Sequence, residues 1–194
     1  ERSFLTDSGA NLNLCADDLP ASLLDGVSMV MVSGYSLFAP GPRSAVLALL
    51  AAARAHGVAV AIDPASVGFL LEVGPAAFLD WTHGADWIFA NAEEAQTLTG
   101  AAEATAQMQL LGAHFTHVVI KCGGQGALLG GAAGVRLALP APVVNVLDST
   151  GAGDAFAAGF IAAHLDGADE ATAMAAGIAA GARAVQSIGG QPVG

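Results

Sequence analysis

The feature of this sequence that most constrains its fold is an alternation of short, unbroken apolar runs with longer segments of helical pattern. Unbroken apolar runs are typical of strands buried on both faces, because half-exposed strands alternate apolar and polar residues. The expected strands are Ser28–Ser33, Val58–Ile62, Trp87–Ala90, His117–Lys121 and Val143–Leu147, with a short strand at Arg2–Thr6 and a hairpin of Ala127–Leu129 with Val135–Leu139. The expected helices are Pro42–His56, Val67–His83 with a break near Gly74-Pro75, Asn91–Thr99, Ala101–His114, Gly153–Leu165 and Glu170–Gln186, preceded by a short helix opening at Asp17. This order predicts an α/β fold with a mostly parallel sheet covered by helices on both faces.

Length and charge narrow the function classes. A chain of 194 residues suits one domain, expected to span residues 1–194. The net charge is −11, and Lys121 is the only lysine, which argues against nucleic acid or an anionic membrane as the partner. A phosphate ligand stays compatible with this charge, because backbone amides bind phosphate without a basic side chain.

Apolar runs, cysteines and the start of the chain bear on the cellular location of the protein. No apolar run reaches the ~20 residues that a membrane-spanning helix needs. Cys15 and Cys122 form no CxxC pair and are expected to be free, buried thiols, so a reducing, cytoplasmic location is expected. The start of the chain lacks an initiator Met and a signal-peptide pattern, so we expect further residues upstream of Glu1.

The strand expected at Val143–Leu147 runs into a glycine-containing turn, Asp148–Phe156 (DSTGAGDAF), and a helix leaves it. A strand, a glycine turn and a helix N-terminus form an anion site, because free N–H groups and the helix dipole face the turn. The turn also carries Asp154 in the first helical turn, which suggests proton removal from a hydroxyl that attacks a phosphoryl group. A structural interpretation is also open, with Ser149 or Thr150 capping the helix and Asp154 favouring its dipole.

The Asp148–Phe156 string resembles the DTxGAGDxF signature of the ribokinase-like (PfkB) carbohydrate kinases, with Ser149 in place of the usual Thr. Further segments that are similar to this family are Glu1–Phe4, Gly9–Asn11, Val32–Tyr35, Asp63-Pro64, Asn91–Glu94 (NxxE) and Lys121–Gly126 (K-x-G-x-x-G). The Asn and Arg that often follow Asp-Pro in the family are here Ala65 and Ser66. The resemblance covers roughly the C-terminal two-thirds of the family's fold. It implies a three-layer α/β/α ribokinase-like fold whose N-terminal part is missing.

The resemblance implies roles at the turn and at Asp63. Asp154 would be the catalytic base that contacts and deprotonates the substrate hydroxyl. The amides of Gly151, Ala152 and Gly153 would form the anion hole, which stabilises charge as it develops on the phosphoryl group. Asp63 would lie near the substrate, although its alternative is a turn carboxylate before Pro64.

The resemblance also implies a nucleotide side. Residues expected to bind ATP are Lys121, Gly123, Gly126, Asn91, Glu94 and Gly190. Asn91 and Glu94 would hold water around the Mg²⁺ that accompanies ATP, since Mg²⁺ keeps several waters and needs few protein ligands. Geometry alone favours a second interpretation of this pair, because Asn followed three residues later by Glu is a capping box.

A monovalent-cation site is a further implication of the resemblance. In family members activated by K⁺, the residues corresponding to Asp148 and Thr150 hold the ion together with carbonyls of the loop that corresponds to Val185–Gly190. The alternative is that Asp148 caps the turn.

These expectations combine into an ATP-dependent phosphotransferase that phosphorylates a hydroxyl of a sugar, nucleoside or sugar-like small molecule. The resemblance implies a homodimer formed through the region that includes Arg2–Thr6. Two alternatives stay open: a truncated, non-catalytic nucleotide-binding relative, and a hydroxymethylpyrimidine- or thiazole-type kinase of the same fold. The first is considered because most of the family's sugar contacts precede the part present here.

Overall fold

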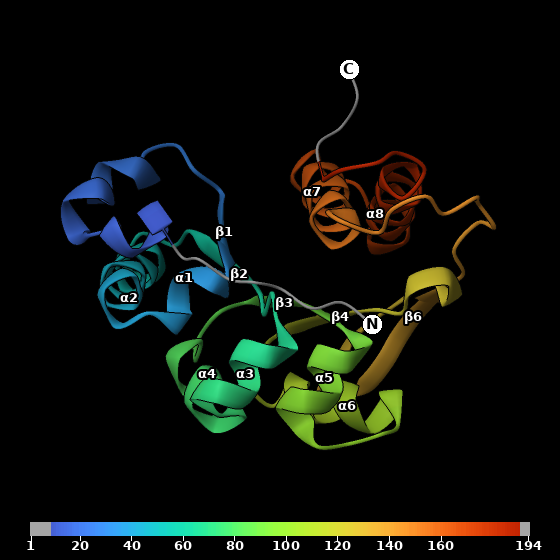
Figure 1. Cartoon of the computed structure of the whole chain (residues 1–194), viewed down its shortest axis with the longest axis horizontal. Coiled ribbons are helices and arrows are strands. Elements are labelled where there is room, and N and C mark those ends of the chain that lie inside the picture. The colour runs from blue at the N-terminus through green and yellow to red at the C-terminus, as the bar shows by residue number, and fades with distance from the viewer. Residues whose placement is uncertain (1–8, 191–194) are drawn as a thin grey trace.

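The computed structural model describes residues 9–190, and a single mixed sheet lies at its centre (Figure 1). The six strands follow the order β1-β2-β3-β4-β5-β6. They are β1 (Met29–Ser33), β2 (Ala59–Asp63), β3 (Trp87–Asn91), β4 (His117–Lys121), β5 (Ala127–Gly131) and β6 (Gly134–Leu139). The first four strands are parallel, and β5 and β6 form an antiparallel hairpin on β4. The predicted α/β class and mostly parallel sheet are therefore confirmed.

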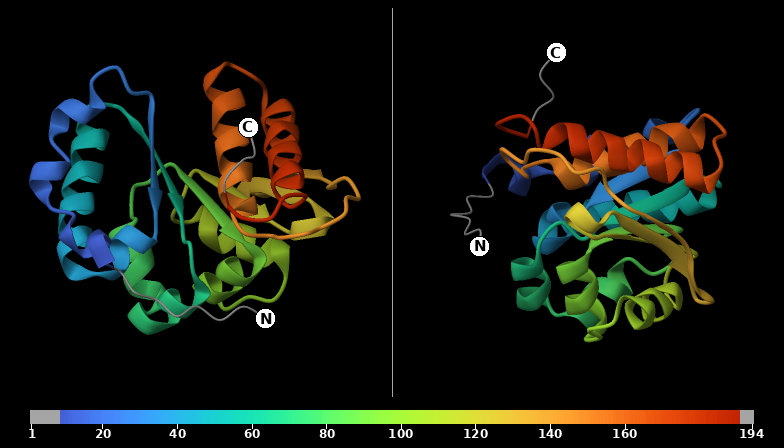
Figure 2. Two further views of the ribbon diagram at one scale, coloured as in Figure 1. Left: turned by 45° about the horizontal axis from the view of Figure 1, so that its top comes forward. Right: turned by 90° about the vertical axis from the view of Figure 1, so that its right-hand side faces the viewer.

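Helices cover both faces of this sheet, as Figure 2 shows. The helices on one face are α2 (Pro40–Ala55), α3 (Val67–Val73), α4 (Pro75–Trp81), α5 (Ala92–Thr99) and α6 (Ala104–Gly112). The other face is covered by α7 (Ala152–Leu165) and α8 (Glu170–Ala184). Alternate strand residues supply the two cores: Ile62 and Ile88 pack in the first, and Ala61 and Phe89 in the second. Both faces are apolar for this reason, and the strands read as continuous apolar runs.

Short helical elements precede β1 or follow a strand. They are the 3₁₀ helices η1 (Gly9–Asn13), η2 (Ala16–Asp18) and η3 (Ala21–Leu24), the one-turn helix α1 (Tyr35–Phe38) after β1, and η4 (Gly123–Gln125) after β4. The short helix expected at Asp17 is thus two 3₁₀ turns, separated by Leu19-Pro20. The predicted break at Gly74-Pro75 is confirmed, because α3 ends and α4 begins there.

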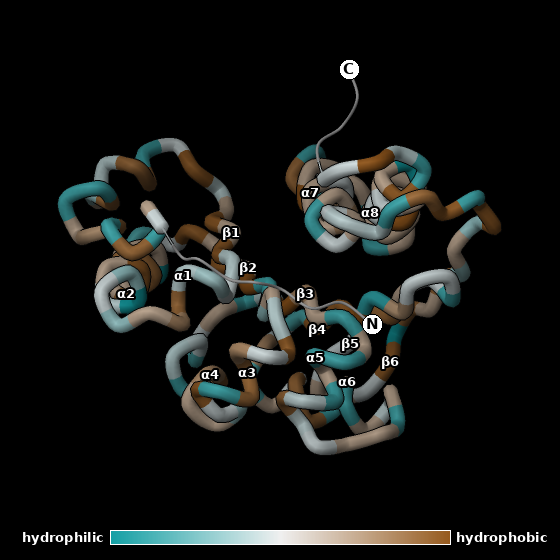
Figure 3. The backbone as a smooth tube through the Cα atoms, in the orientation of Figure 1, coloured by the Kyte–Doolittle hydropathy of each residue, from teal (hydrophilic) through white to brown (hydrophobic). Residues whose placement is uncertain are grey.

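One predicted strand is wrong. The chain at 140–150 is irregular, with Val143 fully exposed and Val146 and Leu147 more than half exposed. Figure 3 shows apolar residues along this stretch, which crosses from β6 to α7 instead of joining the sheet. Its apolar content suggested a strand, but no strand of the described sheet pairs with this segment, so its side chains stay exposed.

Two further expectations need comment. Cys15 and Cys122 are free, as expected, but neither is fully buried: Cys122 is half-buried, and Cys15 is exposed at the N-cap of η2. The strand expected at Arg2–Thr6, and the dimer contact assigned to it, lie outside the described residues. Among residues 9–190, no helix is both long and apolar enough to cross a membrane.

Candidate functional site

A cleft of about 1170 Å³ lies where the parallel strands end and α7 begins. The carboxyl ends of parallel strands meet at one edge of a sheet, and this edge is the usual ligand site of an α/β fold. Here Ser33, Asp63, Asn91 and Lys121 end β1 to β4 in turn, with Ser33 beside Asp63 and Asn91 beside Lys121 in the strand register. All four line the cleft.

The lining brings together nearly all of the residues that the sequence singled out. These are Asp63, Asn91, Glu94, Lys121, Gly123, Gly126, Asp148, Thr150, Gly151, Ala152, Gly153 and Asp154. Gly190 is the exception: it does not line the cleft but packs behind the turn, where a side chain on Gly151 would come within 3.0 Å of the Gly190 carbonyl oxygen. Lys121 is the only basic residue among the lining residues, against five acidic ones.

The turn before α7 is held by Asp148. Its Oδ1 accepts hydrogen bonds from the Thr150 backbone N–H over 2.9 Å and the Thr150 hydroxyl over 2.7 Å. Its Oδ2 accepts from the N–H of Gly189 over 3.0 Å. The alternative interpretation, in which Asp148 caps the turn, is confirmed. The same carboxylate ties the turn to the loop that follows α8.

The N-cap of α7 is Gly151, in the left-handed conformation with φ of 75°, and no side chain caps the helix. The suggestion that Ser149 or Thr150 is the N-cap is therefore wrong: Thr150 bonds to Asp148 instead. The N–H of Ala152 donates to the Ser149 carbonyl over 3.3 Å. The following N–H groups lie in the first turn, where a helix has no acceptor of its own. Gly153 and the exposed Asp154 lie on this first turn at the cleft.

An ion pair crosses the floor of the cleft. The Nζ of Lys121 lies 2.6 Å from Oδ2 of Asp63, and both side chains are about nine-tenths buried. The pair joins the ends of β2 and β4 across β3. Sequence reasoning put Asp63 with the substrate and Lys121 with the nucleotide, and gave no sign that they meet.

The surroundings of Asp63 hold it in place. Its Oδ1 accepts from the N–H of Ala65 over 2.9 Å, and its carbonyl accepts from the N–H of Gly34 over 2.7 Å. Ala65 has φ of 69° and is the only non-glycine residue with positive φ among residues 9–190. A side chain on Gly34 would overlap the Pro64 carbonyl, so Gly34 allows this close approach of the two strand ends.

Asn91 and Glu94 form the capping box expected from their spacing, at the start of α5. The Glu94 side chain is 3 % exposed. Burial, with a smaller contribution from the Asp63 charge, raises the pKa of Glu94 to about 7, although the Asn91 N–H and Lys121 favour the charged form. A buried carboxyl group with a pKa near neutrality that lines a cleft is a common mark of a functional site.

The glycines after Lys121 shape a tight loop. Gly126 N–H donates to the Gly123 carbonyl over 3.0 Å, and the Gly126 carbonyl accepts from Cys122 over 2.8 Å. Both glycines have positive φ, and a side chain on Gly126 would overlap the Leu139 carbonyl. The K-x-G-x-x-G spacing thus brings the chain back from β4 into β5 while leaving Lys121 at the cleft.

Tyr35 is a candidate that sequence reasoning did not select. It lies at the start of α1, packs edge-on against Phe38 and Phe69, and lines the cleft with its side chain half exposed. Burial, then the charges of Glu94, Asp154 and Asp63, raise the pKa of Tyr35. Tyr35 and Ser33 also line a second hollow of about 550 Å³, so the two spaces meet at these residues. The available signal was its position as the sole tyrosine, directly after a strand-ending glycine.

Comparison with known proteins identifies similar sequences and similar solved structures. The chain is 27% identical to 5-dehydro-2-deoxygluconokinase of Geobacillus thermodenitrificans over 93% of its own length and 56% of the relative. Its fold matches adenosine kinase from Sinorhizobium meliloti with a TM-score of 0.88, at 23% identity over 94% of this chain and 56% of that one. It also matches a putative ribokinase II from E. coli, solved with ATP and Mg²⁺, with a TM-score of 0.80, at 26% identity over 92% and 58%.

The chain thus spans just over half the length of these proteins. The sequence pattern described as pfkB family carbohydrate kinase matches residues 1–193, which is almost all of the chain. The turn at residues 151–153 and Asp154 both line the cleft at the strand ends. The family match over residues 1–193 shows that the chain that carries them belongs to the pfkB family of carbohydrate kinases.

Proposed function

We propose that this protein transfers the terminal phosphoryl group of ATP to a hydroxyl of a sugar, a nucleoside or a similar small molecule. The observation that carries the proposal is the position of Asp154 beside the uncapped α7 N-terminus, in the cleft that also holds Lys121 and Glu94. A helix N-terminus attracts phosphate, and an acid beside it can accept a proton from the attacking hydroxyl. The ATP and Mg²⁺ bound to the E. coli match support the choice of donor.

In this proposal Asp154 takes the proton of the acceptor hydroxyl. The turn from Gly151 to Gly153 binds the phosphoryl oxygens as negative charge develops on them, which is the larger part of phosphoryl-transfer catalysis. Lys121 and the loop of Gly123 and Gly126 bind the nucleotide phosphates. The acceptor enters from the side of Tyr35, where the two hollows meet.

The cleft offers few protein ligands for Mg²⁺, but the ion needs few. No three His, Cys, Asp or Glu side chains of residues 9–190 are grouped closely enough to form a metal site by themselves. Mg²⁺ retains waters and takes phosphate oxygens as ligands, so the carboxylate of Glu94 and the amide of Asn91 would suffice to hold its water shell. Bound there, the ion would neutralise charge on the ATP phosphates.

A K⁺ site is less well supported. Both oxygens of the Asp148 carboxylate already accept hydrogen bonds, from Thr150 and from Gly189. The Val185 carbonyl likewise accepts from the N–H groups of Leu147 and Asp148. A cation at this position would compete with those donors, so the arrangement fits a structural tie better than an ion site.

The test is ATP turnover by the natural protein with a panel of sugars, sugar acids and nucleosides, followed through release of ADP. We expect Asp154→Asn to lower kcat by about 10² or more. Asp166→Asn, an exposed acid at the other end of α7, is the matched control and should leave turnover unchanged. Full turnover by Asp154→Asn would refute the assignment of the base. Binding of Mg²⁺·ATP without turnover of any acceptor would instead favour a non-catalytic nucleotide-binding relative.

A further inference from the structure

The ion pair between Asp63 and Lys121 has a position that neither residue's expected role explains. Lys121 Nζ lies 2.6 Å from Asp63 Oδ2, and a side chain at Gly153 would come within 3.1 Å of the same Nζ. The ammonium group therefore lies over the first turn of α7. This is where a phosphoryl group would bind at the helix N-terminus.

We propose that Asp63 is a positioning residue, which holds the Lys121 ammonium group at the α7 N-terminus so that Lys121 binds the phosphoryl group in transit. The inference rests on the proposed function and deepens it. Lys121 acts on the terminal phosphoryl group of ATP rather than on the inner phosphates. Asp63 acts through Lys121 and does not contact the acceptor.

The carboxylate of Asp63 is fixed in orientation. One oxygen is bound by the N–H of Ala65, and the backbone carbonyl is bound by the N–H of Gly34. The turn that supplies the Ala65 N–H is held in a left-handed conformation, which a residue with a Cβ rarely adopts. These contacts leave the second oxygen, Oδ2, directed at Lys121.

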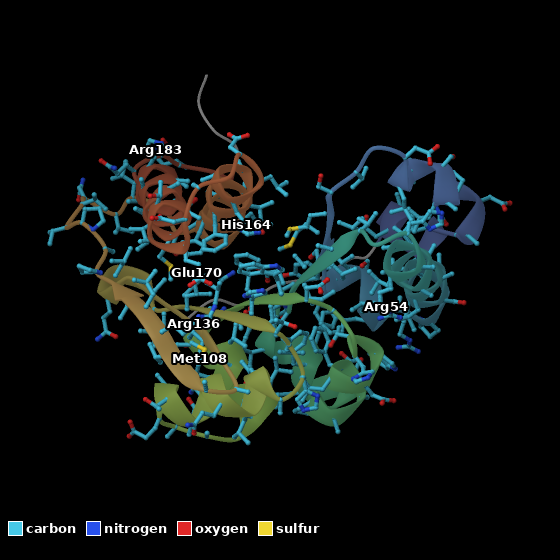
Figure 4. The ribbon with its side chains drawn as sticks, turned by 180° about the vertical axis from the view of Figure 1, so that it is seen from behind. Arg54, Met108, Arg136, His164, Glu170 and Arg183 are labelled. Atoms are coloured by element: carbon cyan, nitrogen blue, oxygen red, sulfur yellow. The ribbon has the colours of Figure 1, made fainter. Side chains whose placement is uncertain are left out.

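Lys121 is the cation that the cleft offers. An ammonium group has three N–H donors, and Asp63 takes one of them. The other basic side chains of the described residues lie elsewhere: Arg43 stacks on Trp81, Arg54 donates to the His83 carbonyl, and Arg136 pairs with Glu170. Figure 4 labels Arg54, Arg136 and Arg183 in three separate parts of the molecule. Charge that develops on a phosphoryl group in the cleft is therefore met by Lys121.

Glycine at position 153 agrees with this geometry. The second residue of α7 is glycine, although alanine is the better helix former. The absent side chain leaves the space that the Lys121 ammonium group occupies. The same absence lets a ligand reach the backbone of the turn.

The test is a double-mutant cycle on Asp63→Asn and Lys121→Met in the natural protein. Asn retains an oxygen for the Ala65 N–H, so the turn is kept while the carboxylate partner of Lys121 is lost. We expect Lys121→Met to lower kcat by about 10²-fold or more and Asp63→Asn by about 10-fold, with the KM for the acceptor changed less than about 3-fold. The double variant should match Lys121→Met within about 2-fold.

A binding measurement completes the test and does not need turnover. Calorimetry with Mg²⁺·ATP and Mg²⁺·ADP should show that Lys121→Met weakens ATP by at least about 5-fold more than ADP, because only ATP carries the terminal phosphoryl group. Thermal unfolding of each variant checks folding, and Lys121→Gln replaces Lys121→Met in the cycle if the Met variant does not fold.

The outcomes separate this inference from the proposed function. Effects on kcat that multiply in the double variant, a rise in acceptor KM alone for Asp63→Asn, or equal losses of ATP and ADP affinity would each overturn the inference. Absence of turnover by the unmodified protein with every acceptor would contradict the proposed function. The ATP and ADP affinities would still decide the role of Lys121.

Discussion

Asn91 and Glu94 bond to each other in both directions at the start of α5. The Asn91 N–H donates to Glu94 Oε2 over 2.8 Å, and the Glu94 N–H donates to Asn91 Oδ1 over 2.9 Å. The bond that Asn91 donates favours the charged form of Glu94, but burial outweighs it, and the pKa of Glu94 rises to about 7. The carboxyl group is thus a helix cap and a group that titrates near neutral pH.

The first prediction concerns the pH dependence of stability. The pKa of Glu94 is about 7 in the folded protein against its usual 4.5, so the folded state holds this proton more tightly than the unfolded state does. The stabilising contribution of the proton is complete below pH 4.5 and is lost as the pH rises through 7. Glu94→Gln removes the titration while keeping an acceptor for the Asn91 N–H. EDTA is added to remove Mg²⁺. We expect the free energy of unfolding of the variant, relative to that of the natural protein, to rise by about 3 kcal/mol between pH 4.5 and 8.

Denaturant unfolding at a series of pH values measures this difference. Glu72→Gln is the matched control, because Glu72 is an exposed acid on α3 and is not among the charges that shift the Glu94 pKa. The control should follow the natural protein across the range. A constant stability difference between Glu94→Gln and the natural protein at every pH would show that burial does not hold the Glu94 proton.

The second prediction concerns Gly151. Its φ of 75° disfavours any residue with a Cβ, and the new Cβ would lie 3.0 Å from the Gly190 carbonyl oxygen. Gly26 has a similar φ of 71° but open space around it, which makes it the matched control. We expect Gly26→Ala to lower the free energy of unfolding by about 1–2 kcal/mol, and Gly151→Ala by more. Equal losses in the two variants would contradict the prediction, because they would mean that the loop containing Gly190 moves away from the new Cβ at no cost in stability.

The third prediction concerns Ala65, whose φ of 69° is strained for alanine. Asn adopts the left-handed conformation more readily than other residues with a side chain. Ala65→Asn should therefore raise the free energy of unfolding by about 0.5–1 kcal/mol. Ala65→Val should lower it by about 1–2 kcal/mol, because a β-branched residue tolerates this conformation poorly. The midpoint of thermal unfolding measures both, and a stabilising Val would contradict the strain.

Much of the fold follows from local patterns in the sequence. Strands β1 to β4 could be predicted because they are largely apolar runs. The cap of α5 could be predicted from the three-residue spacing of Asn91 and Glu94. The segment before α7 shows the limit of this reasoning. Val143–Leu147 is as apolar as a strand, but whether a run joins a sheet depends on a neighbouring strand with free N–H and C=O groups. The composition of the segment itself does not show whether such a neighbouring strand is present.

The candidate site likewise has one part that could be predicted from local sequence and another that could not. Its turn could be predicted, because a glycine-rich string between apolar segments has a local signature. The contact between Asp63 and Lys121 could not, because it joins residues 58 positions apart through the order of β2, β3 and β4. Tyr35 was missed for a similar reason, since only the packing of α1 against the cleft shows which way it faces.

The last prediction separates stability from activity at Gly153. Its φ is not in the left-handed region, and a new Cβ would meet only the flexible end of Lys121, at 3.1 Å. Gly153→Ala should therefore leave the free energy of unfolding unchanged or raise it by up to about 1 kcal/mol, since alanine favours a helix. The displaced ammonium group should lower kcat by about 10-fold or more. Gly41→Ala, at the matching second residue of α2, should stabilise the protein equally and leave kcat unchanged, and a Gly153→Ala variant with full kcat would show that the position of Lys121 over the turn is unimportant.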